Sequence, residues 1–269
     1  MIAKRLSRVL PEPVVRRVAG LRGRGKVDPT DNVAYNRELW DWYADRWKDD
    51  VQFRGDEADV PDTAMSNQQR LAVLGNEWGT SAEVERILAE FIDPFVTPES
   101  IAGEIGVGGG RVAAKVADRV GELWCFDISA RMLERAREHM GERPGVHFEL
   151  LDGARLPEHA TGRFDFLYSF DVFVHLDLHT IWKYLNEVER ALQSGGRAFL
   201  HTSNLTAPTG WANFARQDRY RPQDHYFVTP EVIHTLVSHT GLAFVKESTP
   251  EPDSFYLGRD YLFVLEKPA

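Results

Sequence analysis

A glycine-rich loop carries the clearest chemical signal in the sequence. In EIGVGGGRVA, residues 104–113, four glycines fall within five positions after an apolar run. Such a loop lets a nucleotide come close to the backbone. A Walker loop is excluded because no lysine follows, and the dinucleotide pattern G-x-G-x-x-G fails because Arg111 takes the place of its third glycine. The pattern that fits is E-x-G-x-G-x-G, formed by Glu104, Gly106, Gly108 and Gly110.

This loop and four later segments resemble the motifs of class I S-adenosylmethionine-dependent methyltransferases. The second motif ends in Asp127, 23 positions after Glu104, and the third, LLDGARLP, contains Asp152. The fourth motif, FDFLYSFDVFVHL, ends its strand at Ser169, and the fifth is ERALQSGGRAFL. The resemblance covers roughly residues 99–269, and it implies S-adenosyl-L-methionine as the cofactor.

The resemblance also implies roles for individual residues. Asp127 is expected to bind the ribose hydroxyls through a charge-assisted, two-point hydrogen bond. Asp152 is expected to meet the adenine amino group, and Met132 to pack near the adenine ring. The full set of expected cofactor-binding residues is Glu104, Gly106, Gly108, Gly110, Asp127, Ile128, Met132, Asp152, Gly153, Ala154 and Ser169.

The fourth motif indicates the methyl acceptor by what it lacks. Methyltransferases of base amines and glutamine amides usually carry N/D-P-P and an aromatic residue there, whereas this chain has SFDV at residues 169–172. A hydroxyl acceptor fits better, and its reaction benefits from a general base. We expect His175, just after the fourth strand, and His201, at the end of the fifth, to face the pocket as catalytic residues.

A metal ion beside the acceptor is the alternative to a histidine base. In DVFVHLDLH, residues 171–179, two aspartates and two histidines stand at spacings that a metal could use. Mg²⁺ prefers oxygen ligands, and Asp177 is the expected N-cap of the next helix, so we predict no metal site. A metal-free histidine base predicts activity that falls below pH about 6.5.

The long segment after the fifth strand, residues 204–227, is expected to form a lid insertion over the acceptor. Its aromatic rings and its Arg and Asn donors suit a polyhydroxylated or anionic small molecule, and sugar hydroxyls are the favoured acceptor. The expected substrate-contacting residues are Tyr35, Trp42, Asn204, Trp211 and Tyr226.

Composition limits the remaining function classes. The chain has 269 residues, a hydrophobic content of 43% and no run of 18 apolar residues, so a globular protein without a transmembrane helix is expected. The single cysteine, Cys125, excludes disulfides and cysteine-ligated metal centres within one chain, and it suits a reducing cytoplasm. The net charge of −9 argues against nucleic acid as a partner.

The pattern of elements predicts three regions. Residues 1–30 form a basic arm, because residues 1–26 hold eight Lys/Arg and one acidic residue among apolar ones; this suits a weak membrane-surface contact or a docked helix. Residues 31–98 read as a helical cap, and residues 99–269 as the methyltransferase domain. There, strands alternate with helices until the last two strands. We predict an α/β, Rossmann-like, doubly wound seven-stranded sheet with an antiparallel last strand and an N-terminal helical extension.

The expected function is transfer of a methyl group from S-adenosylmethionine to a hydroxyl of a small molecule, such as a sugar or a glycosylated natural product. Two alternatives stay open: a protein or peptide methyltransferase, and a non-catalytic S-adenosylmethionine-binding partner module. A nicotinamide-dependent reductase is disfavoured by Arg111. The sequence predicts no particular oligomeric state.

Overall fold

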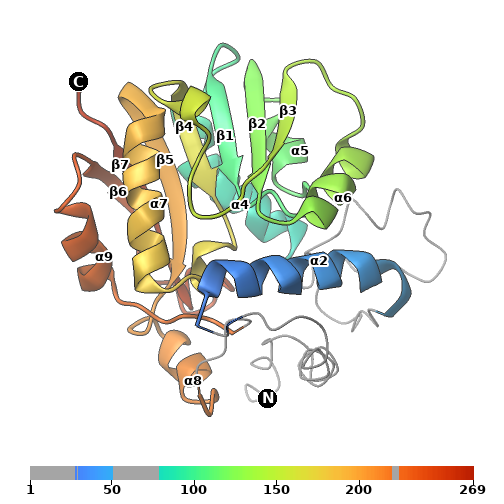
Figure 1. Cartoon of the computed structure of the whole chain (residues 1–269). Coiled ribbons are helices and arrows are strands. Elements are labelled where there is room, and N and C mark those ends of the chain that lie inside the picture. Colours follow the sequence, from blue (N-terminus) through green and yellow to red (C-terminus); the bar gives the residue numbers. More distant parts are fainter. Residues whose placement is uncertain (1–27, 29, 51–78, 220–223) are drawn as a thin grey trace.

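Seven strands form one mixed sheet in the order β3-β2-β1-β4-β5-β7-β6 (Figure 1). The computed structural model describes residues 28, 30–50, 79–219 and 224–269, with the backbone alone for residues 46–50. The strands are β1 (Ile101–Ile105), β2 (Glu122–Asp127), β3 (Val146–Leu150), β4 (Phe164–Ser169), β5 (Leu192–Ser203), β6 (Ala243–Glu247) and β7 (Asp260–Glu266). Residues 1–26, for which a membrane-surface contact is predicted, and residues 51–78 of the predicted cap lie outside the described residues.

The strand directions confirm the predicted sheet. The first five strands pair with one another in parallel, whereas β7 runs antiparallel to both β5 and β6. A parallel connection between β6 and β7 would need a crossover of a dozen or more residues, usually a helix. Only the segment 248–259 joins them, with no helix in it, and the two strands form a hairpin-like pair.

The sheet has its switch point between β1 and β4. β1 pairs with β2 on one side and with β4 on the other, so successive connections leave in opposite directions. In open α/β sheets, ligands bind at the carboxyl ends of the strands at such a point. The glycine loop, residues 106–110, follows β1 directly and therefore lies at this position.

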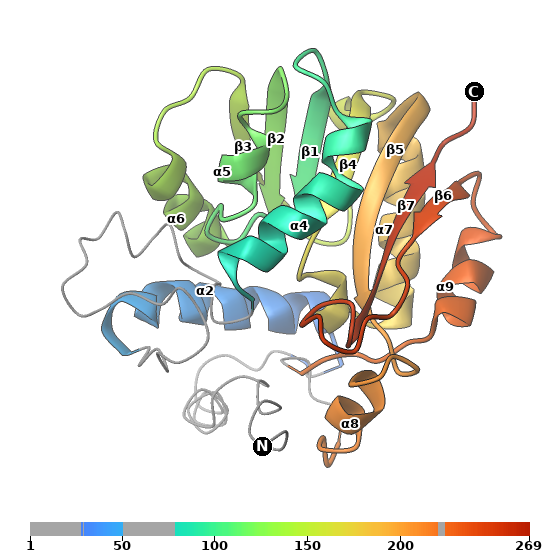
Figure 2. The same ribbon diagram turned by 180° about the vertical axis from the view of Figure 1, so that it is seen from behind.

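Helices cover both faces of the sheet. One face carries α4 (Ser81–Phe91), α5 (Ala113–Val116) and α6 (Ala130–Met140), and the other carries α7 (Leu178–Ala191) and α9 (Pro230–Val237). Figure 2 shows α4 in front of the strands, on the side opposite to α7.

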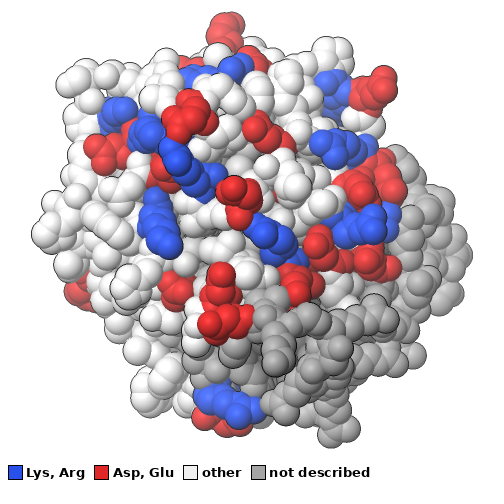
Figure 3. All heavy atoms as spheres, viewed as in Figure 1, with Lys and Arg blue, Asp and Glu red and all other residues white. Residues whose placement is uncertain are grey.

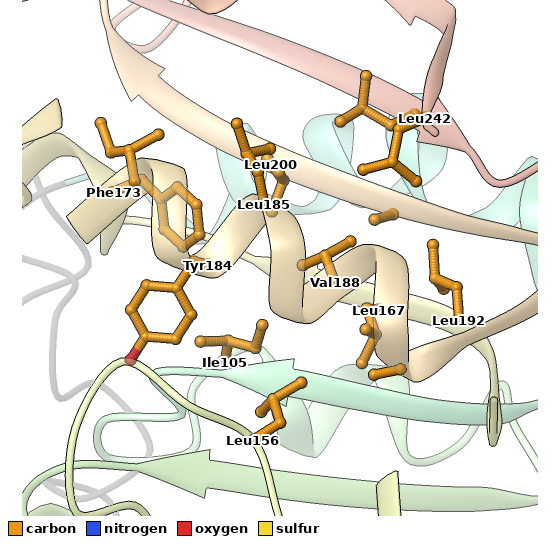
Figure 4. Packing of buried hydrophobic residues seen from close by; sticks show 14 of the residues in the cluster. Ile105, Leu156, Leu167, Phe173, Tyr184, Leu185, Val188, Leu192, Leu200 and Leu242 are labelled. Carbon is orange, nitrogen blue, oxygen red and sulfur yellow. The ribbon is translucent and has the colours of Figure 1, made fainter. Parts of the chain in front are cut away.

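The apolar spacing of α7 explains how it packs. Tyr184, Leu185 and Val188 are buried on one stripe of the helix. Figure 4 shows this stripe near Leu167 of β4 and Leu200 of β5. Burial of such a stripe fixes the rotation of the helix on the sheet.

Helix α2 (Asn32–Asp50) has a different position, across the carboxyl ends of the parallel strands (Figure 1). The side chain of Asp31 accepts a hydrogen bond from the Ala34 amide at 3.0 Å, and Asp31 therefore caps the N-terminus of this helix. In contrast, α4 packs into the core of the sheet, although it also falls within the predicted cap, residues 31–98. Of the two helices, α2 is the one positioned to cover a pocket at the strand ends.

The described surface carries charges of both signs. On the face with α7, acidic and basic side chains are intermixed (Figure 3). None of the described helices has the length and apolarity needed to cross a bilayer.

Candidate active site

The glycine loop after β1 has a backbone that other residues rarely adopt. Gly106, Gly108 and Gly110 have φ values of 81°, 54° and 84°. A Cβ on Gly106 would lie 2.4 Å from a methyl carbon of Val172, whereas a Cβ on Gly108 would meet no atom within 4 Å. The first glycine is needed for close packing, and the second leaves open space at the strand end.

Two buried carboxyl groups flank this loop. Glu104 is the penultimate residue of β1 and accepts a hydrogen bond from the Tyr168 hydroxyl at 3.0 Å. Asp127 ends β2 and accepts from the backbone amides of Gly108 at 2.9 Å and Ser129 at 2.8 Å. Burial raises the pKa of Glu104 well above its ordinary value and that of Asp127 to about 6. The site therefore favours cationic or hydrogen-bond-donating ligand groups beside these carboxyls.

Both carboxyl groups face one pocket, which encloses about 980 Å³ of space between protein atoms, part of it open to solvent. The loops after β1, β2 and β4 form three of its sides. The fourth is α2, which contributes Val33, Asn36, Trp40 and Tyr43.

Hydrogen bonds tie α2 to the pocket loops. Arg37 donates from Nε to the Ile128 carbonyl at 3.2 Å and from Nη2 to the Asp152 carbonyl. Asp41 accepts from the Ser129 hydroxyl at 2.6 Å. At the start of the helix, Asn32 Nδ2 donates to the carbonyl of His175 at 3.1 Å. A single helix thus contacts the loops after β2, β3 and β4.

His175 lies in the pocket wall with a defined tautomer. Its Nδ1 lies 3.3 Å from the carbonyl oxygen of Asp224. A carbonyl can only accept, so Nδ1 carries the proton and Nε2 keeps the lone pair of a base. Burial lowers the pKa of His175 to about 4, so the ring is neutral at neutral pH.

A family model described as a methyltransferase domain matches residues 103–196, which contain the glycine loop, both carboxyl groups and His175. Residues 103–196 are a methyltransferase domain.

Solved methyltransferase structures have the same fold. The magnesium protoporphyrin IX methyltransferase of Synechocystis PCC 6803, with bound SAH, is 16% identical, with a TM-score of 0.60 over 88% of this chain and 100% of that one. An S-adenosylmethionine-dependent methyltransferase from Mesorhizobium loti is 19% identical (TM-score 0.56; 69% of this chain, 98% of that one). The N-methyltransferase NodS of Bradyrhizobium japonicum WM9 is 17% identical, with a TM-score of 0.54 over 70% of this chain and 87% of that one. A search of curated proteins found no match. The predicted class I methyltransferase fold is confirmed.

Within the methyltransferase domain, the structure brings six of the predicted cofactor residues to the pocket wall. These are Glu104, Gly106, Gly108, Asp127, Ile128 and Met132. Asp152, Gly153 and Ala154 line an adjoining groove beside Arg37. Gly110 packs against α6, and the Ser169 hydroxyl donates to the Ile105 carbonyl at 2.8 Å; neither lines the pocket.

The structure places His201 apart from His175. It is fully buried and does not line the pocket of the methyltransferase domain. Its Nδ1 accepts from the Asp171 amide at 3.1 Å, and its Nε2 lies 3.0 Å from an oxygen of Asp260. We expected His201 to face the pocket, but the neighbouring strand β7 supplies the carboxylate that this ring faces instead. Its contacts are those of a structural residue.

The substrate residues expected on α2 lie one position away from those in the wall. Tyr35 and Trp42 do not line the pocket, whereas Asn36, Trp40 and Tyr43 do. A rotation of about 100° per residue separates adjacent helical positions. The aromatic content of the segment predicted a ring-bearing helix, but not which of its rings would face the sheet.

The candidates in the segment 204–227 are also outside the pocket wall. The Asn204 side chain accepts from the amide of Thr206 at 3.0 Å and from its hydroxyl at 2.8 Å. Trp211, on the short helix α8 (Gly210–Phe214), is 61% exposed. The backbone of Tyr226 bonds to Val174, so the end of the segment packs beside His175. Residues 220–223 lie outside the described part.

Sequence reasoning missed a pair of charged residues in the wall. Arg111 Nη2 donates to Asp171 Oδ2 at 2.9 Å, and the Tyr256 hydroxyl donates to the same oxygen at 2.9 Å. Asp171 has a φ of 59°, which is rare for a residue with a side chain. In the sequence, Arg111 stands out only because it replaces the third glycine of the dinucleotide pattern. The pair joins positions 60 residues apart, which no local motif reveals.

The segment considered for a metal is divided between two elements. Phe173–His175 is a short 3₁₀ helix, and α7 begins at Leu178 with Asp177 as its N-cap, bonded to the Thr180 amide at 2.8 Å. His175 and His179 therefore do not share a helix face. Across the described residues, no group of three or more His, Cys, Asp or Glu is arranged to hold a metal ion.

Proposed function

We propose that this protein transfers the methyl group of S-adenosylmethionine to a hydroxyl of a small molecule. The observation that carries the proposal is the single pocket that joins the glycine loop and two buried carboxyls to the neutral ring of His175. S-adenosylmethionine supplies an electrophilic methyl group on a positively charged sulfur.

The residues of the pocket fit this cofactor. The buried Glu104 carboxyl suits the positively charged amino acid part, because a cation beside it would offset the burial that disfavours its ionised form, and Asp127 suits the ribose hydroxyls. Ile128 and Met132 supply apolar surface for adenine. The open space at Gly108 lets the ligand approach the backbone.

His175 would act on the acceptor. Its Nε2 takes the hydroxyl proton as the oxygen forms a bond to the methyl carbon and the carbon–sulfur bond breaks. The products are a methyl ether, neutral S-adenosylhomocysteine and a protonated His175, which then returns its proton to water. Because α2 closes one side of the pocket, a small acceptor is favoured over the side chain of a folded protein.

Calorimetry with S-adenosylhomocysteine tests the cofactor site, and we expect a micromolar Kd. A panel of hydroxylated small molecules, amines and peptides with isotope-labelled S-adenosylmethionine then tests the reaction. Labelled methyl ethers are the expected product. Methylamines or methylated peptides would overturn the hydroxyl assignment, and binding without transfer to any acceptor would favour a non-catalytic module.

The tether between α2 and the pocket loops gives a further prediction. Arg37→Ala removes two hydrogen bonds that hold the helix over the cofactor site. At roughly 0.5–1.5 kcal/mol for each bond, the two together contribute about 1–3 kcal/mol, and S-adenosylhomocysteine should dissociate about 5- to 150-fold faster in stopped-flow measurements. Arg86→Ala, which breaks an exposed pair with Glu251 elsewhere, should leave the rate unchanged. Equal rates in both variants would show that α2 does not retain the cofactor.

A further inference from the structure

Aromatic rings surround the proposed base at the transfer end of the pocket. Trp40 of α2 meets His175 edge to face, with ring centroids 5.5 Å apart. His225 stacks on His175 at 5.6 Å with an interplanar angle of 12°. The base is thus enclosed by flat side chains from two other segments of the chain.

These rings belong to a row that leads to the protein surface. His225 contacts Phe227 at 5.8 Å, and Phe227 contacts Phe214 at 5.9 Å. Phe214 in turn contacts Trp211 at 5.5 Å. At this outer end both rings are exposed, Trp211 by 61% and Phe214 by 42%. The ring row, Trp40–His175–His225–Phe227–Phe214–Trp211, therefore joins the pocket to an exposed aromatic pair.

The imidazole rings of His175 and His225 add no positive charge to the ring row. Burial lowers the pKa of His225 well below its ordinary value and that of His175 to about 4. Both rings are neutral at neutral pH. The two rings of the row that line the pocket, Trp40 and His175, therefore offer flat, uncharged surface to a ligand.

Polar side chains expected to hold a sugar are engaged elsewhere. The Asn204 oxygen is occupied by Thr206. Arg216 donates to the Ala212 carbonyl at 2.9 Å and to the Asn213 side chain at 3.0 Å, within its own turn. The polar side chains that remain in the pocket wall include Arg111 and Asp171, which bond to each other. A sugar packed against the aromatic rings would therefore leave some of its hydroxyls unpaired, at a cost for each of them.

We propose that the acceptor is a flat, uncharged aromatic molecule with a phenol-type hydroxyl, whose ring packs against Trp40 and whose hydroxyl meets His175 Nε2. This rests on the proposed function and names the substrate class of the same site. In the transfer, the phenolic oxygen bonds to the methyl carbon, the carbon–sulfur bond breaks, and the phenolic proton passes to His175. An aryl methyl ether and S-adenosylhomocysteine result.

The acidity of the hydroxyl agrees with this class. A histidine whose pKa is about 4 is a weak base. A phenolic hydroxyl has a pKa near 10, several units below the value of 15.7 for water. Proton transfer from a phenol to such a base is therefore less unfavourable than transfer from a hydroxyl of water-like acidity.

Two probe compounds test the proposal on the full chain loaded with S-adenosylhomocysteine. We expect 1-naphthol to bind in calorimetry at least tenfold more tightly than methyl β-glucoside. With S-adenosylmethionine, mass spectrometry should show 1-methoxynaphthalene. Tight binding or methylation of the glucoside without that of 1-naphthol would overturn the substrate class but leave the function standing. Failure to bind S-adenosylhomocysteine would instead remove the function itself.

Variants of the ring row provide the structural control. Trp40→Ala should weaken 1-naphthol binding at least fivefold, whereas Trp40→Phe keeps a ring and should stay within about twofold of the wild type. Trp211→Ala, at the exposed end of the row and outside the pocket wall, should stay within about twofold of the wild type. Leu150→Ala removes an apolar side chain that is 54% exposed on β3 and should change nothing. Wild-type 1-naphthol binding in Trp40→Ala would show that the acceptor does not pack against Trp40.

Discussion

Replacing His175 by alanine should lower kcat by at least tenfold, and by about 10²–10⁴-fold if the ring acts as a full general base. Its Nδ1 donates to a backbone carbonyl, which leaves Nε2 as the proton acceptor. Steady-state rates with labelled S-adenosylmethionine measure the effect, and the Kd of S-adenosylhomocysteine should stay within about threefold. His239→Ala, at an exposed position of the chain, is the control.

The pH profile separates a base from a merely structural ring. His175 accepts a proton only when neutral, so activity is lost as pH falls through its pKa. Burial places that pKa at about 4, well below the value of about 6.5 expected from an ordinary histidine. At saturating cofactor, kcat should therefore hold constant from pH 7 to about 5 and then fall. An acid limb unchanged in an active His175→Ala variant would exclude the assignment.

Asp127→Ala should weaken S-adenosylhomocysteine binding by about 1.5–3 kcal/mol, the worth of hydrogen bonds to a charged group. This corresponds to a 10- to 150-fold higher Kd, measured by calorimetry. The variant also loses the bonds from the Gly108 and Ser129 amides, which hold two pocket loops together. Asp127→Asn, which keeps acceptor and shape but not charge, should lie between wild type and alanine.

The charge of Asp127 gives this prediction a pH signature. Burial raises its pKa to about 6, and the ionised form is the better partner for ribose hydroxyls. Affinity should fall as pH drops through about 6 in the wild type, and much less in Asp127→Asn. Unchanged affinity in Asp127→Ala would contradict the ribose contact.

The sequence predicted the sheet because its signals are local. Most strands carry a short apolar run, and the order of strands and helices decides between parallel and antiparallel pairs. The E-x-G-x-G-x-G pattern then identified the loop that follows β1, which lies at the switch point. The pattern is visible in the sequence because the left-handed backbone of this loop favours glycine at Gly106, Gly108 and Gly110.

The rest of the site depends on contacts between distant segments. Helix α2 carries aromatic residues all around, so only packing on α6 and the pocket loops decides that Trp40 rather than Trp42 faces inward. The contact between His201 and Asp260 likewise depends on strand pairing, because Asp260 is the first residue of β7, which pairs antiparallel with β5. Arg111 and Asp171 meet only when the loops after β1 and β4 come together.

The hydrogen bonds at the two ends of one helical stretch have a thermodynamic consequence. Asn32 holds the carbonyl of His175, and Arg37, just over one turn later, holds that of Asp152. Any displacement of this stretch therefore disturbs the donor half and the acceptor half of the pocket together. If occupation of one half stabilises the closed position, linkage requires that the affinities of the two substrates rise by the same factor. Methyl donor and acceptor should then bind cooperatively, and slow release of the demethylated donor would limit turnover.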